Sequence, residues 1–127
     1  MILWKTSLDS HVYSCKSSSA SFLPIVFSPP GHRTSIHFSI YLPTAGKDTE
    51  FVEEVVKLGN CIEELLEKHE DAILFIRGDA NVNPNNVARC RILKSFCNQW
   101  NLVSSTIHHP TYHHFTGQGA SDSQLDI

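Results

Sequence analysis

Alternating apolar and polar positions predict that the chain begins with β-structure. The segment 35–42 alternates strictly and predicts a strand whose inward side consists of Ile36, Phe38, Ile40 and Leu42. Pro43 follows and ends this strand, since proline lacks the N–H that a sheet requires. Shorter apolar runs predict three earlier strands, at residues 1–5, 11–15 and 22–27.

Two later segments carry apolar residues at helical spacing. The first begins near Asp48 or Thr49, either of which is expected to cap it. Its apolar stripe, which should cover a sheet, consists of Phe51, Val55, Leu58, Ile62, Leu65 and Leu66. The second spans 87–100 after a capping loop at 83–86, and its core side consists of Ile92, Leu93, Phe96 and Trp100. Its cationic side chains are expected on a solvated face, namely Arg89, Arg91 and Lys94.

Between the two helices, an apolar run at 72–77 predicts a buried strand that stops at Gly78. Asp79 and Asn81 follow with one residue between them, so both side chains should point the same way. A carboxylate beside an amide that donates and accepts is suited to orienting water next to a phosphate. An ordinary turn is the alternative, because Gly-Asp and Asn-Pro sequences readily form turns.

The remaining segments complete an α/β pattern. Short strands are predicted at 102–106 and 111–115, a loop at 117–121, and the start of another strand at 125–127. Strands followed by strands that alternate with helices predict one layered α/β domain, residues 1–127, with a mixed sheet. The last residues look like the start of a strand and residues 1–4 like the middle of an element, so we expect the chain to be a fragment of a larger domain.

Composition narrows the possible environments of the chain. With 127 residues, 41% of them hydrophobic, and a net charge of -3, the chain is globular without an overall basic footprint for nucleic acid. The four cysteines lack CxxC spacing, which favours reduced thiols over a zinc site. Adjacent histidines at 108–109 and 113–114 should point to opposite faces, and are expected to be polar strand or loop residues. Without a signal peptide or a long apolar run, the expected location is the nucleus or cytoplasm.

Three motifs at strand ends follow one another in a specific order. They are the Tyr-x-Pro at 41–43, the Gly-Asp-x-Asn at 78–81, and a serine-containing strand that ends in Leu-Asp at 121–126. This set resembles the endonuclease/exonuclease/phosphatase superfamily, and within it the apurinic-endonuclease-like domain of non-LTR retrotransposons. The segment 109–117 also resembles the Pro-Thr segment that precedes the family's last strand. The resemblance spans the whole chain and implies a partial four-layer α/β sandwich, with two covering helices and without the N- and C-terminal strands.

The resemblance implies phosphodiester hydrolysis with Mg²⁺ as cofactor and DNA as partner. Asp79 matches the aspartate that orients or deprotonates the attacking water, and Asn81 matches the asparagine that holds this aspartate and the phosphate. Tyr41 matches the tyrosine whose hydroxyl contacts the phosphate. Asp126 matches the aspartate that orients a catalytic histidine further on. Such chemistry requires a positioned water, donors at the developing charge and a metal.

Two family elements have no counterpart in this sequence. They are the metal-binding glutamate with its preceding asparagine, and the terminal Ser-Asp-His segment; at most Asp79 and Asn81 remain near a metal. We therefore expect a DNA endonuclease half-site that is impaired or inactive in this chain. A non-catalytic domain remnant and a phosphatase or phosphodiesterase of the same superfamily stay open as alternatives. The sequence implies neither a membrane partner nor an obligate protein partner.

Overall fold

The computed structural model describes residues 1–104, 112–116 and 119–126. The elements follow one another as η1 (Thr6–His11), β1 (Val12–Ser14), β2 (Phe22–Phe27), β3 (Ser35–Tyr41), α1 (Asp48–Lys68), β4 (Ile73–Val82), α2 (Val87–Gln99), β5 (Tyr112–Thr116) and β6 (Gly119–Asp126). After β3, strands alternate with two helices, which confirms the α/β class.

The strands of the described residues lie in the order β1-β2-β3-β4-β6-β5. The first three pair antiparallel, whereas β3 and β4 are parallel, so the sheet is mixed as predicted. The connection from β3 to β4 passes through α1, and it places Tyr41 opposite Asp79 in the ladder. Strand β6 runs antiparallel to β4 and pairs the backbone of Asp126 with that of Asp79. Segments far apart in the sequence therefore meet where β3 and β4 end.

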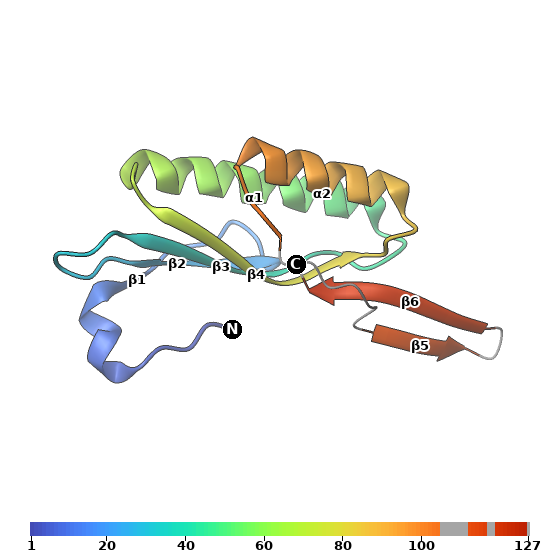
Figure 1. The fold of residues 1–127 in the computed structure, drawn as a ribbon, viewed down its shortest axis with the longest axis horizontal. Coiled ribbons are helices and arrows are strands. Elements are labelled where there is room, and N and C mark those ends of the chain that lie inside the picture. The colour runs from blue at the N-terminus through green and yellow to red at the C-terminus, as the bar shows by residue number, and fades with distance from the viewer. Residues whose placement is uncertain (105–111, 117–118, 127) are drawn as a thin grey trace.

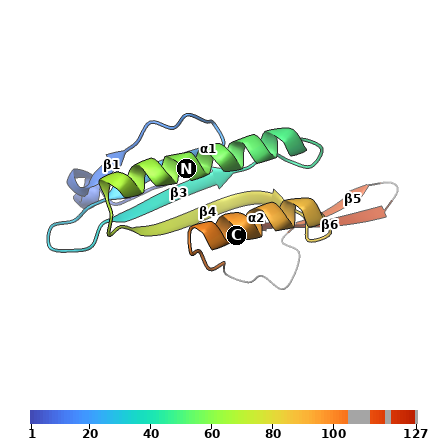
Figure 2. The same cartoon turned by 90° about the horizontal axis from the view of Figure 1, so that it is seen from above.

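Both helices cover the same face of the sheet, and they lie side by side above it (Figures 1 and 2). The N-terminal segment lies on the opposite side of the sheet (Figure 1). In the part of the chain that the structure describes, no helix is both long and apolar enough to cross a membrane. The sheet thus has one face buried under helices and one face that is largely open.

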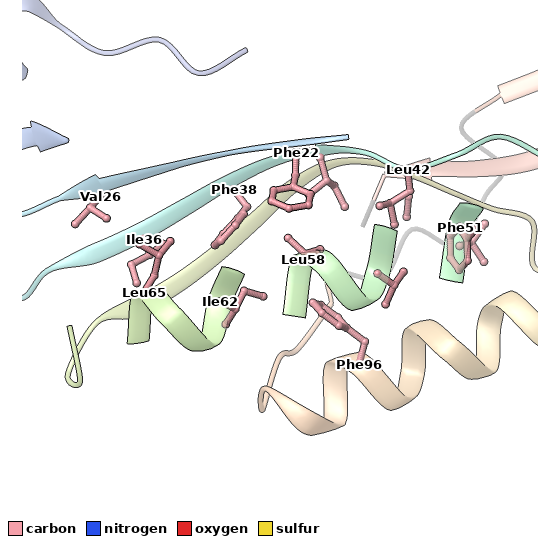
Figure 3. Packing of buried hydrophobic residues seen from close by; sticks show 14 residues of the cluster. Phe22, Val26, Ile36, Phe38, Leu42, Phe51, Leu58, Ile62, Leu65 and Phe96 are labelled. Atoms are coloured by element: carbon pink, nitrogen blue, oxygen red, sulfur yellow. The ribbon is translucent and has the colours of Figure 1, made fainter. Parts of the chain in front are cut away.

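The core lies between the sheet and α1, with α2 completing one side (Figure 3). The inward side chains predicted for the segment 35–42 are all buried, and Ile36 is the most deeply enclosed. The stripe of α1 is confirmed from Phe51 to Leu65, whereas Leu66 is only partly buried. Each large apolar side chain that is fully buried stabilises the fold by about 1.5–3 kcal/mol. This packing holds the ends of β3 and β4 in place.

Two predicted strands are absent from the described residues. Residues 1–5 form no strand, because this apolar run finds no neighbouring strand to pair with; the Trp4 indole instead donates to Asp9 Oδ1 at 3.0 Å. Residues 102–104 lie outside any strand, and the Leu102 N–H donates to the Cys97 carbonyl at 2.8 Å, close behind α2. The rest of that prediction, at 105–106, lies outside the described residues.

The C-terminal hairpin agrees with the sequence in part. The strand predicted at 111–115 corresponds to β5, although residue 111 lies outside the described part of the chain. The loop predicted at 117–121 is shorter than expected, since β6 already begins at Gly119 and pairs with Thr116. Antiparallel pairing in this hairpin therefore extends into residues whose small, polar composition suggested a loop.

Candidate functional site

The strand that bears Asp79 and Asn81 is longer than the sequence suggested. It was expected to stop at Gly78, but β4 continues to Val82 because its last residues still pair with β3 and β6. Ala80 and Val82 are buried, whereas Asp79 and Asn81, which alternate with them along the strand, are half-buried. This alternation places the two polar residues on the same side of the strand, as predicted.

Asp79 and Asn81 are joined by a local hydrogen bond. The backbone N–H of Asn81 donates to Asp79 Oδ1 at 2.8 Å, and Asn81 adopts a left-handed backbone with a φ of 51°. Asparagine tolerates this conformation better than most residues. A side chain that accepts from the backbone two residues on forms an Asx turn. The turn weighed as an alternative is thus present within the strand, and it sets the direction of the carboxylate.

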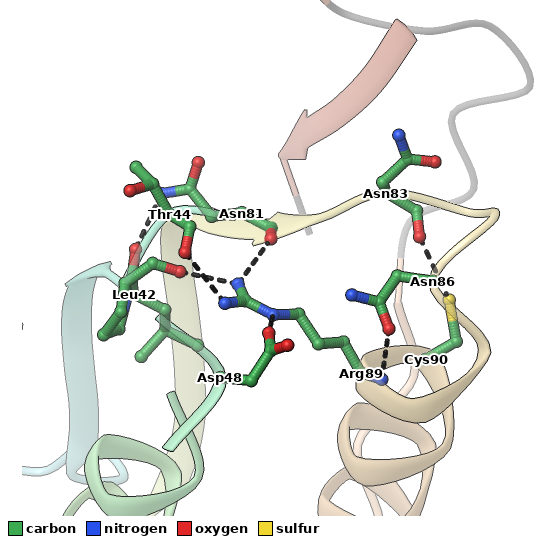
Figure 4. Close-up of polar contacts among 9 residues, drawn as sticks. Leu42, Thr44, Asp48, Asn81, Asn83, Asn86, Arg89 and Cys90 are labelled. Carbon is green, nitrogen blue, oxygen red and sulfur yellow. Dashed lines mark hydrogen bonds and ion pairs between the residues drawn. The ribbon is translucent and has the colours of Figure 1, made fainter. Parts of the chain in front are cut away.

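The Asn81 side chain also closes the end of the parallel strand pair. Its Nδ2 donates to the Leu42 carbonyl at 2.7 Å (Figure 4), and the Leu42 N–H donates to the Asp79 carbonyl at 2.9 Å. Because a carbonyl only accepts, the amide must turn its NH₂ group towards Leu42. The amide orientation is therefore fixed by the strand next to it.

Tyr41 lies directly beside Asp79, on the neighbouring strand. Its backbone N–H donates to the Ser21 carbonyl at 2.7 Å, and its side chain is 61% exposed. Tyr41 and Asp79 both line a hollow of about 550 Å³, together with Ser39 and the loop at 17–21. A hollow of this size is large enough for a small ligand. The structure therefore brings an exposed phenol and a carboxylate together at one surface.

Asp126 completes the set of predicted residues by its position in the backbone. It is the residue of β6 that pairs with Asp79, so the ends of β3, β4 and β6 meet at one place. Its side chain, like those of all residues from 105 onward, lies outside the described part of the chain. The histidine pairs at 108–109 and 113–114 fall in the same region.

Arg89 is the residue of this region that the sequence analysis placed wrongly. It was expected on a solvated face with Arg91 and Lys94, and those two are exposed, but Arg89 is only 2% exposed. Its guanidinium Nη1 donates to the carbonyls of Pro43 at 2.6 Å and Asn81 at 3.0 Å (Figure 4).

The second amino group of Arg89, Nη2, donates to the Thr44 carbonyl at 2.8 Å. The guanidinium is thus enclosed by backbone oxygens from the ends of two strands. Periodicity would have revealed this, because Arg89 precedes Leu93 and Phe96 by four and seven residues and shares their core stripe.

Asp48 also differs from its expected role. Helix α1 begins at Asp48 itself, its N-cap is Lys47, and no side chain caps it, so neither Asp48 nor Thr49 is the cap. Asp48 instead accepts a hydrogen bond from Arg89 Nε at 2.8 Å. The guanidinium of Arg89 also lies 4.3 Å above the Phe51 ring, a favourable cation–π distance. The cap expected before α2 is confirmed, since the Asn86 side chain accepts from the Arg89 N–H.

On the open face of the sheet, a histidine lies close to a cation. His37 stacks on Phe75 with ring centroids 5.0 Å apart, and its Nε2 is 2.9 Å from Ser35 Oγ. Burial lowers the pKa of His37, and the positive charge of Arg77 lowers it further. Both causes therefore favour the neutral form of His37.

The described residues offer little to a metal ion. Within 1–104, 112–116 and 119–126, no three His, Cys, Asp or Glu side chains lie together in a metal-binding group. Mg²⁺ is often held by one or two carboxylates, with phosphate and water oxygens completing its shell. Asp79, and at most Asn81 beside it, fits that minimal arrangement.

No protein-family model, no curated protein and no solved structure matches this chain. Membership of the superfamily therefore stays a prediction, which rests on the three sequence motifs. What the fold adds is their proximity, because all three meet at the carboxyl end of the β3–β4 pair or beside it.

Proposed function

We propose that this chain is a phosphodiester hydrolase domain of the retroelement endonuclease type, and that its substrate is DNA. The proposal is supported above all by the adjacent positions of Tyr41 and Asp79, with Asn81 bonded to both strands. Ligands of open α/β sheets commonly bind outside the carboxyl ends of the strands, which is where these residues lie. The backbone of Asp126 runs beside Asp79, in agreement with the order of motifs.

In the proposed reaction, a water oxygen forms a bond to phosphorus while one ester P–O bond breaks, and the sugar oxygen leaves with the electron pair of that bond and takes a proton from solvent. Asp79 accepts a hydrogen bond, or the proton, from this water, because an ionised carboxylate is purely an acceptor. Tyr41 is exposed and donates its hydroxyl hydrogen to a phosphate oxygen. Asn81 holds Asp79 through its backbone N–H. A bound Mg²⁺ would neutralise charge on the phosphate.

The proposed activity is weak in this chain. Among the residues that the structure describes, no three His, Cys, Asp or Glu side chains gather into a metal-binding group at this edge. We therefore expect DNA binding with slow nicking. The nicking rate should lie far below the roughly 1–1,000 turnovers per second that are typical of enzymes.

A nicking assay on supercoiled DNA tests the proposal. The wild-type chain, Asp79→Ala and Asn81→Ala would be compared in Mg²⁺ and in EDTA, with Asp71→Ala as the control because Asp71 is an exposed aspartate away from the site. We expect slow nicking that requires Mg²⁺, is lost in both site variants and is kept in the control. Nicking that persists in both site variants would rule out this site, and rapid nicking would contradict the impairment.

A non-catalytic DNA-binding domain is the second candidate. It is favoured by the lack of a metal-binding group of three or more side chains within the described residues. In that case the chain binds labelled duplex DNA and nicks no DNA at any concentration of Mg²⁺. Asp79→Ala, which removes a negative charge beside the phosphate, should then leave the affinity unchanged or raise it. Release of phosphate from inositol phosphates, without DNA nicking, would instead support the phosphatase alternative.

A further inference from the structure

Arg89 joins the two strand ends that form the proposed site. One nitrogen, Nη1, donates both to Pro43, just after β3, and to Asn81 in β4. The other, Nη2, donates to Thr44, the next residue of the loop after β3. A planar guanidinium presents its donors at fixed angles, so these bonds set the spacing between the two segments. Tyr41 and Asp79 belong to these same strand ends.

The backbone of Asn81 depends on this contact. Its N–H is bonded to Asp79, its side-chain amide to Leu42, and its carbonyl to Arg89. A left-handed backbone costs a non-glycine residue about 1–2 kcal/mol, so such a conformation persists only where its surroundings hold it. Without the Arg89 bond, Asn81 would relax towards an extended φ. That change would withdraw its N–H from Asp79 and its amide from Leu42.

Arg89 is itself firmly held and does not face a ligand. It is 2% exposed, its Nε donates to Asp48, and its guanidinium lies over the Phe51 ring. A buried charge must be paired and hydrogen-bonded, and these contacts meet that requirement. Because Arg89 is enclosed, it acts on the site through Asn81 and the loop after β3.

We infer that Arg89 is the positioning residue of the proposed site, which fixes the left-handed backbone of Asn81 and so aims Asp79 and Tyr41 at one DNA phosphate. This inference rests on the proposed function. It gives a specific role to a cation that would otherwise count only as a structural buried charge.

Arg89→Lys tests the inference, because lysine keeps the charge and loses the planar set of donors. Two variants serve as controls. Arg91→Lys changes an exposed cation two residues away. Leu65→Ala removes a core side chain that is 7% exposed (Figure 3). Leu65 lies near the C-terminal end of α1, away from Asp48 at its N-terminal end. All variants would be compared at a temperature at which urea unfolding shows them to be folded.

Two measurements separate positioning from stability. The first is the NMR resonance of the Asn81 side-chain amide, and the second is the affinity for a fluorescein-labelled DNA duplex. We expect Arg89→Lys to shift the Asn81 resonance and weaken binding about tenfold, because a misplaced Tyr41 hydroxyl would no longer donate well to the phosphate. Leu65→Ala and Arg91→Lys should leave both measurements unchanged.

The outcomes distinguish the inference from the proposed function. An unchanged Asn81 resonance in folded Arg89→Lys overturns the inference, and so does an equal loss of affinity in Leu65→Ala. If the wild-type chain binds no DNA while Arg89→Lys still shifts the Asn81 resonance, the proposed function fails and the positioning of Asn81 by Arg89 stands.

If Arg89→Lys does not fold, Asp48→Asn is the second variant. It weakens the ion pair that holds the Arg89 guanidinium, and it changes a side chain that is 70% exposed. A smaller shift of the Asn81 resonance is expected in that variant, and no shift would overturn the inference.

Discussion

Gly78 lies against the backbone of Ile40 so closely that a Cβ on Gly78 would be 2.0 Å from the Ile40 carbonyl oxygen. The two residues are opposite each other in the β3–β4 ladder, and Gly78 has a φ of 131°. Both the close approach and the positive φ require glycine. The strand pair therefore leaves no room for a side chain on the residue that precedes Asp79.

Gly78→Ala is expected to destabilise the chain strongly. The new methyl group would overlap the Ile40 carbonyl, and the backbone would keep a φ that alanine rarely adopts, so we expect a loss of more than about 3 kcal/mol. Gly46→Ala is the matched control, because its φ is 88° and nothing lies within 4 Å of the added Cβ. The control should lose about 1 kcal/mol. Urea unfolding measures both losses, and equal values would contradict the steric argument.

Substitution of Asn81 should separate the cost of its backbone from the value of its side chain. Asn81→Ala keeps neither the tolerance for a left-handed φ nor the bond to Leu42, so we expect a loss of about 2–3 kcal/mol in unfolding free energy. Asn81→Gly loses only the bond and should cost about 1 kcal/mol. Asn101→Ala, at an exposed residue with a φ of 53°, reports the backbone cost alone. If Asn81→Ala and Asn101→Ala cost the same, the Leu42 bond contributes nothing.

His37 should make the stability of the chain depend on pH. Its pKa is below the ordinary value of 6.5, chiefly through burial and then through Arg77, so the unfolded chain takes up the proton more readily. Where the unfolded state binds more protons than the folded state, a drop in pH lowers the free energy of unfolding. We therefore expect His37 to contribute a decline that begins as the pH falls through the region of 6.5. Urea midpoints should decline less steeply in His37→Gln, and parallel profiles would exclude this role.

The cysteines should react slowly in the folded chain. Burial raises the pKa of the Cys15, Cys61 and Cys97 thiols above 9.0, and the thiolate is the form that is alkylated. All four cysteines are free thiols. Site-resolved mass spectrometry after iodoacetamide treatment should show slower labelling of these three in buffer than in urea. Labelling at the same rate in both conditions would show that burial does not protect them.

The sequence predicted the parts of the fold that depend on local periodicity. The alternation in β3 and the stripe of α1 placed Phe38 and Phe51 in the core, and the structure confirms both. The motif at the end of β4 correctly indicated that Asp79 and Asn81 share a side. Each of these features follows from residues that are close together in the chain, so a single sequence contains the information.

The contacts that the sequence did not predict join distant segments. Arg89 was assigned to solvent because cations usually are, and its carbonyl partners become visible only when β3, β4 and α2 are folded together. Asp48 was assigned as a helix cap because aspartate is common at that position. Its actual partner, Arg89, is far along the chain and could not be recognised from the local sequence. The apolar run at 1–5 was assigned as a strand although pairing requires a neighbour that it lacks.

The short connection between β4 and α2 has a consequence for changes in chain length. Only residues 83–86 separate Val82 from Val87, and the Asn86 N–H donates to the Asn83 carbonyl at 2.8 Å within them. Arg89 and Asn81 bond to each other across this tight turn. An inserted residue would rotate and displace the start of α2, and so separate the guanidinium from all three of its carbonyls. Insertions should be tolerated better at the exposed tip of the hairpin loop between β2 and β3, at Gly31, than between β4 and α2.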